Sequence, residues 1–337
     1  MNRVQQGITG WLLSVALVGS AAAQSVTAPA LFPAPFPIAG KPLRIVVPFP
    51  AGGQTDIHAR LIAPKLGEVL GVPVLVDNKP GASTIIAAQD VAHASPDGHT
   101  IFYTSLITHT QNPHLYAKLP YDAFKDFTPI MHFVRAPLAL VVANAVPATT
   151  LQELISYAKA NPGRVNYASI SPGSTSHLYA ELLQLQTGIE LVHIPYKGTA
   201  DAMPDLFGNQ VQMLFDGTLT AAQNSRAGKV RLIAVTGERR LAAMPETPTA
   251  AEQGVSGLEL TGFIGFFGPA GMAPDTVRRL NTELARVANQ PDMLDMVRKG
   301  GLEPATNSAE DFAQTVREHH QRWGTVIRRI GLTYDLK

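Results

Sequence analysis

LRIVVPFPAGGQTDIHARLIAPKLGEVL occupies residues 43–70 and contains the unit from which the fold class is predicted. Its first five residues, 43–47, form the short apolar run that is typical of a buried strand. Residues 48–53 interrupt that run with two prolines and two glycines. Residues 55–70 then place apolar side chains at helical spacing, so the segment is one strand–loop–helix unit.

The same alternation continues along the chain. In the first series we expect strands over 72–77 and 100–104 and a helix over 84–94. After an apolar run at 138–143, the second series has strands over 165–168, 191–194, 211–215 and 231–236, and helices over 151–160, 174–187, 199–207 and 219–227. A strand or crossover follows at 262–268, and helices over 274–289, 291–300 and 308–330 end the chain. This order predicts an α/β protein with parallel sheets.

Composition narrows the class of protein further. Of 337 residues, 45% are hydrophobic and 16% are charged, which is enough apolar material for a sizeable core and argues against disorder. The formal net charge is +1, so the chain lacks the basic excess of a nucleic-acid-binding protein. Cysteine is absent, which excludes disulfides, thiol catalysis, cysteine-ligated metal and a cysteine-linked lipid anchor.

The first 23 residues are typical of a secretory signal peptide. Arg3 precedes an uncharged stretch, residues 7–23, that ends in an A-x-A pattern at Ala21–Ala23. We therefore expect cleavage after Ala23 and export, with an uncleaved anchor as the alternative. Residues 24–40 are rich in proline and are expected to form an extended leader.

Catalytic and metal-binding motifs are absent from the sequence. No G-x-S-x-G, H-E-x-x-H, Walker or G-x-G-x-x-G pattern occurs, and the ten histidines are not spaced as metal ligands. We expect no metal, no cofactor and no enzymatic activity. A nucleophile–base pair of Ser174 and His177 is conceivable, although Ser174 is better explained as a helix cap.

Two loops are the main candidates for ligand binding. Each follows a strand, contains small or hydroxyl residues and opens a helix, whose free N–H groups and partial positive charge suit an anion. The candidate residues of the first loop are Phe49, Ala51, Gly52, Gly53, Gln54, Thr55 and Asp56, and those of the second are Ser169, Gly173, Ser174, Thr175 and Ser176. Either loop alone is explained by an ordinary capped turn, but a pair facing each other across a cleft would bind an anion.

Three further candidates follow other predicted strands or open another helix. Ser105 follows the strand over 100–104, and Asp216 follows the strand over 211–215. Lys197 precedes the helix over 199–207 and is placed to meet a second charge on a ligand, although it reads equally well as an exposed loop lysine. Asp216 is placed to hold an amine or hydroxyl of the ligand, or serves only as a turn former.

The sequence resembles the exported solute-binding proteins of tripartite tricarboxylate transporters, the Bug-type receptors. The resemblance covers nearly the whole chain after residue 40 and rests on the segments RIVVPFPAGGQTD (44–56), VDNKPGA (76–82), ASPDGHT (94–100), NPHLY (112–116), DFTP (126–129), NYAS (166–169), GSTSHL (173–178), PYKGTA (195–200) and PTAAEQG (248–254). Members often continue with two glycines after the position of Gly81, where this chain has Ala82-Ser83-Thr84. The second loop also departs from the family at Ile170-Ser171-Pro172, and both departures point to a more apolar or aromatic ligand.

The resemblance implies a two-lobed, type II periplasmic-binding-protein fold, with the ligand held between lobes by the loops 50–56 and 169–176. Lobe 1 is expected over 41–141 plus 266–337 and lobe 2 over 142–265. The implied ligand is a small carboxylate: a dicarboxylate, tricarboxylate, acidic amino acid or aromatic acid. The implied location is the periplasm and the implied partners are membrane transporter subunits; we expect a monomer. Two alternatives stay open, namely an exported hydrolase using Ser174 or Ser169 with His177, and a sensor subunit that docks on a receptor kinase.

Overall fold

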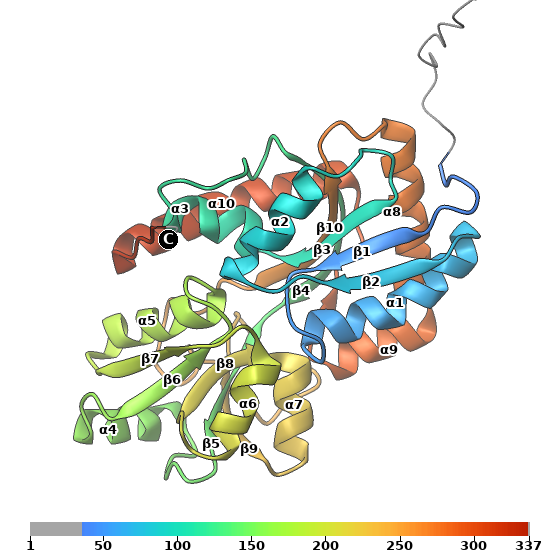
Figure 1. Cartoon of the computed structure of the whole chain (residues 1–337). Helices are drawn as coiled ribbons and strands as arrows, with labels where there is room; N and C mark the ends of the chain where they lie inside the picture. Colours follow the sequence, from blue (N-terminus) through green and yellow to red (C-terminus); the bar gives the residue numbers. More distant parts are fainter. Residues whose placement is uncertain (1–35, 336–337) are drawn as a thin grey trace, which may run out of the picture. The chain divides into compact units, whose positions relative to one another are not determined.

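Two mixed β-sheets, each flanked by helices, form the framework of residues 36–335, the part of the chain that the computed structural model describes (Figure 1). The predicted signal peptide, residues 1–23, and most of the predicted leader lie outside the described residues. Helices and strands alternate as the sequence predicts, and each sheet forms the centre of one lobe. The two-lobed α/β architecture is therefore confirmed.

The first sheet has six strands in the order β11-β4-β10-β3-β1-β2. Its strand β1 is parallel to β2 and β3, whereas β10 runs antiparallel to both β3 and β4. The strands are β1 (Leu43–Val47), β2 (Val74–Asn78), β3 (Thr100–Ser105), β4 (Phe127–Ala136), β10 (Gly262–Pro269) and β11 (Glu303–Pro304).

Strand β1 is buried on both sides, because helices cover both faces of this sheet. Leu43, Ile45 and Val47 pack with apolar residues of α1, α8 and α9, while Val46 belongs to the core on the opposite face with residues of α2 and α10. The helices are α1 (Gln54–Leu70), α2 (Ile85–Ala92), α3 (Asn112–Leu115), α8 (Pro274–Ala288), α9 (Pro291–Lys299) and α10 (Ala309–Ile330), with short irregular helices at Ala82–Thr84 and Ile107–Gln111.

The second sheet has five strands in the order β7-β6-β8-β5-β9. Strand β6 is parallel to β7 and β8, and β5 is antiparallel to β8 and β9. The strands are β5 (Leu138–Ala143), β6 (Val165–Ser169), β7 (Leu191–Pro195), β8 (Met213–Gly217) and β9 (Val230–Val235), and the helices are α4 (Leu151–Ala160), α5 (Thr175–Thr187), α6 (Thr199–Phe207) and α7 (Thr218–Arg226).

The chain crosses between the two sheets twice. It leaves the first sheet from β4 and enters the second directly at β5, with only Pro137 between them, and it returns through residues 236–261 into β10. The last long helix, α10, also contacts the second lobe, since Trp323 packs against Tyr179 of α5 with ring centroids 5.7 Å apart. The predicted lobe boundaries, at 141/142 and 265/266, fall inside β5 and β10, and the division at those residues stays a prediction.

The structure differs from the sequence expectation in the direction of three strands. The sequence predicts parallel sheets, but β10 and β11 in the first sheet and β5 in the second run antiparallel to their neighbours. Strand β10 does so because it returns from the second lobe and enters the first sheet between β3 and β4. Strand β4 is not among the predicted strands. It carries Pro129, His132 and Arg135, which interrupt its apolar pattern, and its pairing with β10 shifts register twice.

Candidate functional site

A cavity of about 90 Å³ lies between the two lobes, at the ends of strands from both sheets. Within residues 36–335, no charged side chain lines it. Its walls are polar or small at the loops and apolar along the crossing strands, and they consist of Phe49, Pro50, Gly53, Gln54, Thr55, Ser105, Leu106, Ile107, Ala136, Leu138, Ile170, Thr175, Thr199, Gly217, Phe263 and Ile264. We refer to this cavity as the cleft.

Four helices begin at the cleft. The N-cap residues of α1, α6 and α7 are Gly53, Gly198 and Gly217, which have no side chain of their own to cap the helix. Helix α5 differs, because the hydroxyl of Ser174 accepts a hydrogen bond from the backbone N–H of His177. A helix without a cap keeps its first N–H groups available and presents the positive end of its dipole, so the cleft favours a negatively charged group.

The side chain of Gln54 already places an oxygen at one of these helix ends. Its Oε1 accepts a hydrogen bond of 3.1 Å from the backbone N–H of Leu219, in the first turn of α7. A Cβ atom at Gly217 would lie 2.7 Å from the same oxygen, so a side chain there would displace the Gln54 carboxamide from this position. The carboxamide therefore joins α1 of the first lobe to α7 of the second.

Other contacts also hold the lobes together around the cleft. The hydroxyl of Ser83 donates to the carbonyl of Pro172, and the amide of Gln111 donates to the hydroxyl of Thr175 over 3.0 Å. The Tyr334 hydroxyl lies 3.0 Å from Nδ1 of His177. These contacts make the present arrangement a closed one, which explains the small volume of the cleft.

Asp216 lies directly behind the cleft wall and is 1% exposed. Its two oxygens accept hydrogen bonds of 2.6 Å from the hydroxyls of Thr199 and Thr220. Burial raises the pKa of Asp216 from 3.8 to about 6, against the lowering effect of those hydrogen bonds. Asp216 does not itself line the cleft and instead orients Thr199, so its contact with a ligand amine or hydroxyl stays a prediction.

Asp56 shapes the first loop rather than lining the cleft. Its carboxylate accepts hydrogen bonds from the backbone N–H of Gly52, over 2.8 Å, and from the side chains of Arg60 and Asn78. Burial alone raises the pKa of Asp56, but the hydrogen bonds from Arg60, Gly52 and Asn78 outweigh it and lower the pKa. The carboxylate thus stays ionised and fixes the turn that precedes α1, while Ala51 is exposed on that turn.

The hydroxyls of the second loop are likewise used within the loop. Ser176 accepts from the N–H of Ile170, Ser174 donates to the carbonyl of Ser171, and Ser169 lies 2.6 Å from Nε2 of His193. Nδ1 of His177 accepts from the N–H of Gly173, so no hydrogen bond joins the hydroxyl of Ser174 to that ring. The arrangement required of a Ser174–His177 nucleophile–base pair is not formed.

The structure therefore brings together part of the predicted site. Among the predicted residues, those that line the cleft are Phe49, Gly53, Gln54, Thr55, Ser105 and Thr175. Those that do not line it are Ala51, Gly52, Asp56, Ser169, Gly173, Ser174, Ser176, Lys197 and Asp216, of which Lys197 is exposed. The lining residues that sequence reasoning missed are mostly apolar, and four of them, Ala136, Leu138, Phe263 and Ile264, belong to the crossing strands. The only signal of these apolar residues is hydrophobicity, which core residues share.

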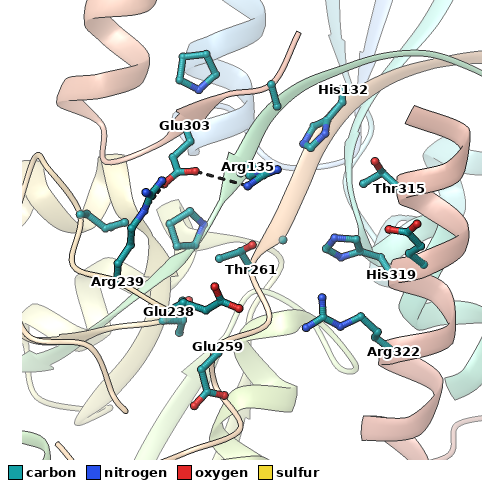
Figure 2. A pocket seen from close by; sticks show the side chains of 18 of the residues that line it. His132, Arg135, Glu238, Arg239, Glu259, Thr261, Glu303, Thr315, His319 and Arg322 are labelled. Carbon is teal, nitrogen blue, oxygen red and sulfur yellow. Dashed lines mark hydrogen bonds and ion pairs between the residues drawn. The ribbon is translucent and has the colours of Figure 1, made fainter. Parts of the chain in front are cut away.

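A second and larger cavity, about 740 Å³, lies on the other side of the crossing strands (Figure 2). Its walls are polar and charged, and none of the four helix N-termini at the cleft contributes to it. Size alone would favour it, but the uncapped helix ends and the closure of the lobes identify the cleft as the principal candidate.

Within residues 36–335, no three acidic or histidine side chains lie close enough together to hold one metal ion. None of the helices in that range has both the length and the apolar character needed to cross a membrane.

Two lobes joined by crossing strands, with helix N-termini directed into the cleft between them, define the class of periplasmic-type solute-binding proteins. The chain belongs to the TctC family, described as "Tripartite tricarboxylate transporter family receptor", and the family model matches residues 58–332. The resemblance drawn from the sequence is thereby confirmed.

Relatives of known structure share both fold and length. "R. palustris Rpa4515 with adipate" is 35% identical, has a TM-score of 0.84, and is matched over 87% of this chain and 98% of that one. The periplasmic binding protein BugD is 33% identical with a TM-score of 0.83 over 88% and 99%. MatC from Rhodopseudomonas palustris, solved with malate, is 33% identical with a TM-score of 0.82 over 87% and 100%. Among curated proteins, the protein BugT of Bordetella pertussis is 31% identical over 86% of this chain and 90% of its own length.

Proposed function

We propose that this protein is a periplasmic, non-catalytic receptor that binds a small carboxylate in the cleft and delivers it to a membrane transporter of the tripartite type. The observation that carries the proposal is the convergence of the glycine-capped N-termini of α1, α6 and α7 on one cavity without a charged side chain. Adipate in one relative and malate in another, both dicarboxylates, support the same ligand class.

The carboxylate takes the place of the Gln54 oxygen. At 90 Å³ the closed cleft is far smaller than the roughly 300–1,000 Å³ of typical ligand sites, so Gln54 must turn away and the lobes must part before a ligand enters. One ligand carboxylate then accepts hydrogen bonds from the helix N-termini, and closure removes water around it, which strengthens each bond.

The rest of the ligand packs on the apolar side of the cleft. Leu106, Ile107, Phe263 and Ile264 form that wall, and Ile170 faces it from the second lobe. An aliphatic or aromatic chain gains from burial there, at about 25 cal/mol per Å² of apolar surface. The proposal therefore favours acids with a hydrocarbon body over highly hydroxylated ones.

The test is a thermal-shift screen of the chain from residue 24 onward, followed by calorimetry. Adipate, malate, benzoate, citrate and glutamate are compared with the uncharged diamide of adipic acid as a matched control. Binding to the folded state raises the melting temperature by mass action. A rise with one or more acids and none with the diamide supports a carboxylate receptor; an equal rise with the diamide refutes recognition of the charge.

A matched pair of variants then tests the cleft itself. Gly53→Asp and Gly53→Asn both supply a favourable N-cap to α1, and the space around Gly53 admits a Cβ atom. Only the aspartate adds a negative charge, and at about 6 Å and an effective dielectric constant of about 20 this opposes a bound carboxylate by about 3 kcal/mol, or roughly 100-fold in affinity. Equal affinities of the two variants would show that the carboxylate binds elsewhere.

A further inference from the structure

The 740 Å³ cavity, here called the rear cavity, lies across the crossing strands from the cleft. Consecutive residues of an extended chain point to opposite sides, so Ala136 and Leu138 line the cleft while Arg135 and Pro137 line the rear cavity. Its volume falls within the range of about 300–1,000 Å³ that is typical of small-molecule sites. The family fold and the proposed function leave this cavity without a role.

Charged side chains of both signs line the rear cavity, and the α10 wall itself carries the acidic Glu318 beside the basic Arg322. Arg322 and His319 project from α10 on one side, and Glu238 and Glu259 come from the segment between β9 and β10 on the other (Figure 2). Within the described part of the chain, neither Arg322 nor Glu238 has a hydrogen-bond or ion-pair partner for its side chain. Both charges are therefore available to a molecule in the cavity.

A third group of charged residues, Arg135, Arg239 and Glu303, lies between these walls and has a net charge of +1. Arg239 donates to Oε1 of Glu303 from Nε, over 3.2 Å, and from Nη2, over 2.6 Å. Arg135 lies 4.0 Å from the other oxygen of the same carboxylate. Two guanidinium groups thus share one glutamate, which leaves one positive charge uncompensated within this group.

The two histidines of the rear cavity add hydrogen-bonding groups without adding charge. His132 is 4% exposed, and its Nε2 donates to the carbonyl of Val134 over 3.0 Å, which makes Nδ1 the acceptor in the neutral ring. Burial, together with nearby positive groups, lowers the pKa of His132 and of His319 to about 4. Nδ1 of His319 is buried without a partner in the described chain, so no protein contact fixes the tautomer of that ring.

We propose that the rear cavity is a second binding site, for a zwitterionic solute of the size of an amino acid or short peptide. The carboxylate of the solute pairs with Arg322 and His319, and its ammonium group pairs with Glu238 and Glu259. A simple anion would face Glu238 unpaired, and a simple cation would face Arg322 unpaired, so the presence of an unpaired charge of each sign favours a molecule that carries both.

Three dipeptide probes of nearly equal size separate the charge requirements: glycylglycine is zwitterionic, N-acetylglycylglycine is anionic and glycylglycinamide is cationic. Calorimetry on the chain from residue 24 onward is expected to detect glycylglycine with at least tenfold higher affinity than either singly charged form. Equal binding of a singly charged probe would overturn the zwitterion assignment. No binding of glycylglycine at millimolar concentration would overturn the site.

Variants place the probe in the rear cavity. Arg322→Gln and Glu238→Gln each remove one charge from opposite walls, and each is expected to weaken glycylglycine binding about tenfold or more. Arg329→Gln on the same helix and Glu68→Gln on α1 change exposed residues outside the cavity and should leave binding unchanged. Unchanged binding in both cavity variants would refute the assignment.

The cleft variant Gly53→Asp separates this site from the proposed function. Glycylglycine binding should survive Gly53→Asp, because Gly53 lines the cleft and not the rear cavity. Loss of dipeptide binding in that variant would place the dipeptide in the cleft and overturn the second site, while leaving carboxylate recognition to be judged by its own experiment.

Discussion

Binding of a carboxylate in the cleft should cause the protein to take up a proton at Asp216. This side chain is buried behind the cleft wall, hydrogen-bonded to Thr199, and its neighbour Gly217 lines the cleft. Its pKa of about 6 makes it responsive near neutral pH. A ligand carboxylate adds a second negative charge nearby, which favours the protonated form of Asp216.

The size of the effect follows from the pKa and from Coulomb's law. Two unit charges about 12 Å apart interact by about 1.4 kcal/mol at an effective dielectric constant of about 20, which raises a carboxyl pKa by about one unit. Starting from a pKa of about 6, Asp216 is about one quarter protonated at pH 6.5, and after such a rise it is about three quarters protonated. Binding should therefore take up about half a proton at this pH.

Calorimetry measures this uptake directly. The binding enthalpy of the same acid is compared at pH 6.5 in two buffers of different ionisation enthalpy, and the difference divided by the difference in buffer enthalpies gives the protons taken up. Uptake should fade toward pH 8.5, where Asp216 stays ionised, and should be absent in Asp216→Asn.

Two results would refute the reasoning. Wild-type uptake near zero at pH 6.5 would mean either that the carboxylate binds far from Asp216 or that Asp216 titrates in the ordinary range. Equal uptake in wild type and Asp216→Asn would assign the proton to another group.

Three further predictions concern stability and closure. Because the pKa of Asp216 in the folded protein lies above its value of 3.8 in the unfolded chain, the folded state loses about 3 kcal/mol of stability as pH rises from about 4 to 6. Asp216→Asn removes this loss, at the cost of about one hydrogen bond, so thermal unfolding should show the variant gaining stability relative to wild type over that pH range. A stability difference that does not change with pH would contradict the raised pKa. Gly198→Ala places a Cβ atom 2.7 Å from Cδ of Pro50 across the cleft, while the extended backbone at Gly198 accepts alanine. Because the added methyl group obstructs closure, calorimetry should show carboxylate affinity reduced about tenfold or more; full affinity would show that closure does not bring these residues together. Gln54→Ala removes the hydrogen bond to the Leu219 amide, worth about 1 kcal/mol, so hydrogen exchange of that amide should accelerate about fivefold. The amide of Ile233 in β9 serves as the unaffected control. An unchanged exchange rate at Leu219 would refute the hydrogen bond.

Much of the fold could be predicted from local signals. Helix α4 occupies the predicted residues 151–160 because Thr150 caps it, with the hydroxyl accepting from the N–H of Glu153, and Asn161-Pro162-Gly163 ends it. Strand β4 could not be predicted, because its extended conformation depends on pairing with β10, which is distant in the sequence. His132 is accommodated in it by stacking on Phe312 and by its hydrogen bond to the Val134 carbonyl.

The candidate site was predictable where it depends on helix starts. Gly53 and Thr175 lie at predicted strand–loop–helix junctions and do line the cleft. The hydroxyls of Ser174 and Ser176 could not be assigned, because a serine that caps its own loop and a serine that faces a ligand have the same sequence signal. Whether the cleft residues bind the ligand stays a prediction that the Gly53 variants test.

The position of β10 has a consequence for how the chain folds. Strand β10 begins at Gly262 and lies between β3 and β4, so the first sheet cannot be completed until the whole second lobe has been synthesised. Until then β3 and β4 each present an unpaired edge, and closing so long a loop slows folding and prolongs the exposure of those edges to other chains. The second lobe, whose five strands all lie between residues 138 and 235, is free to fold first. Shortened chains that end before Gly262 should therefore aggregate through these two strands.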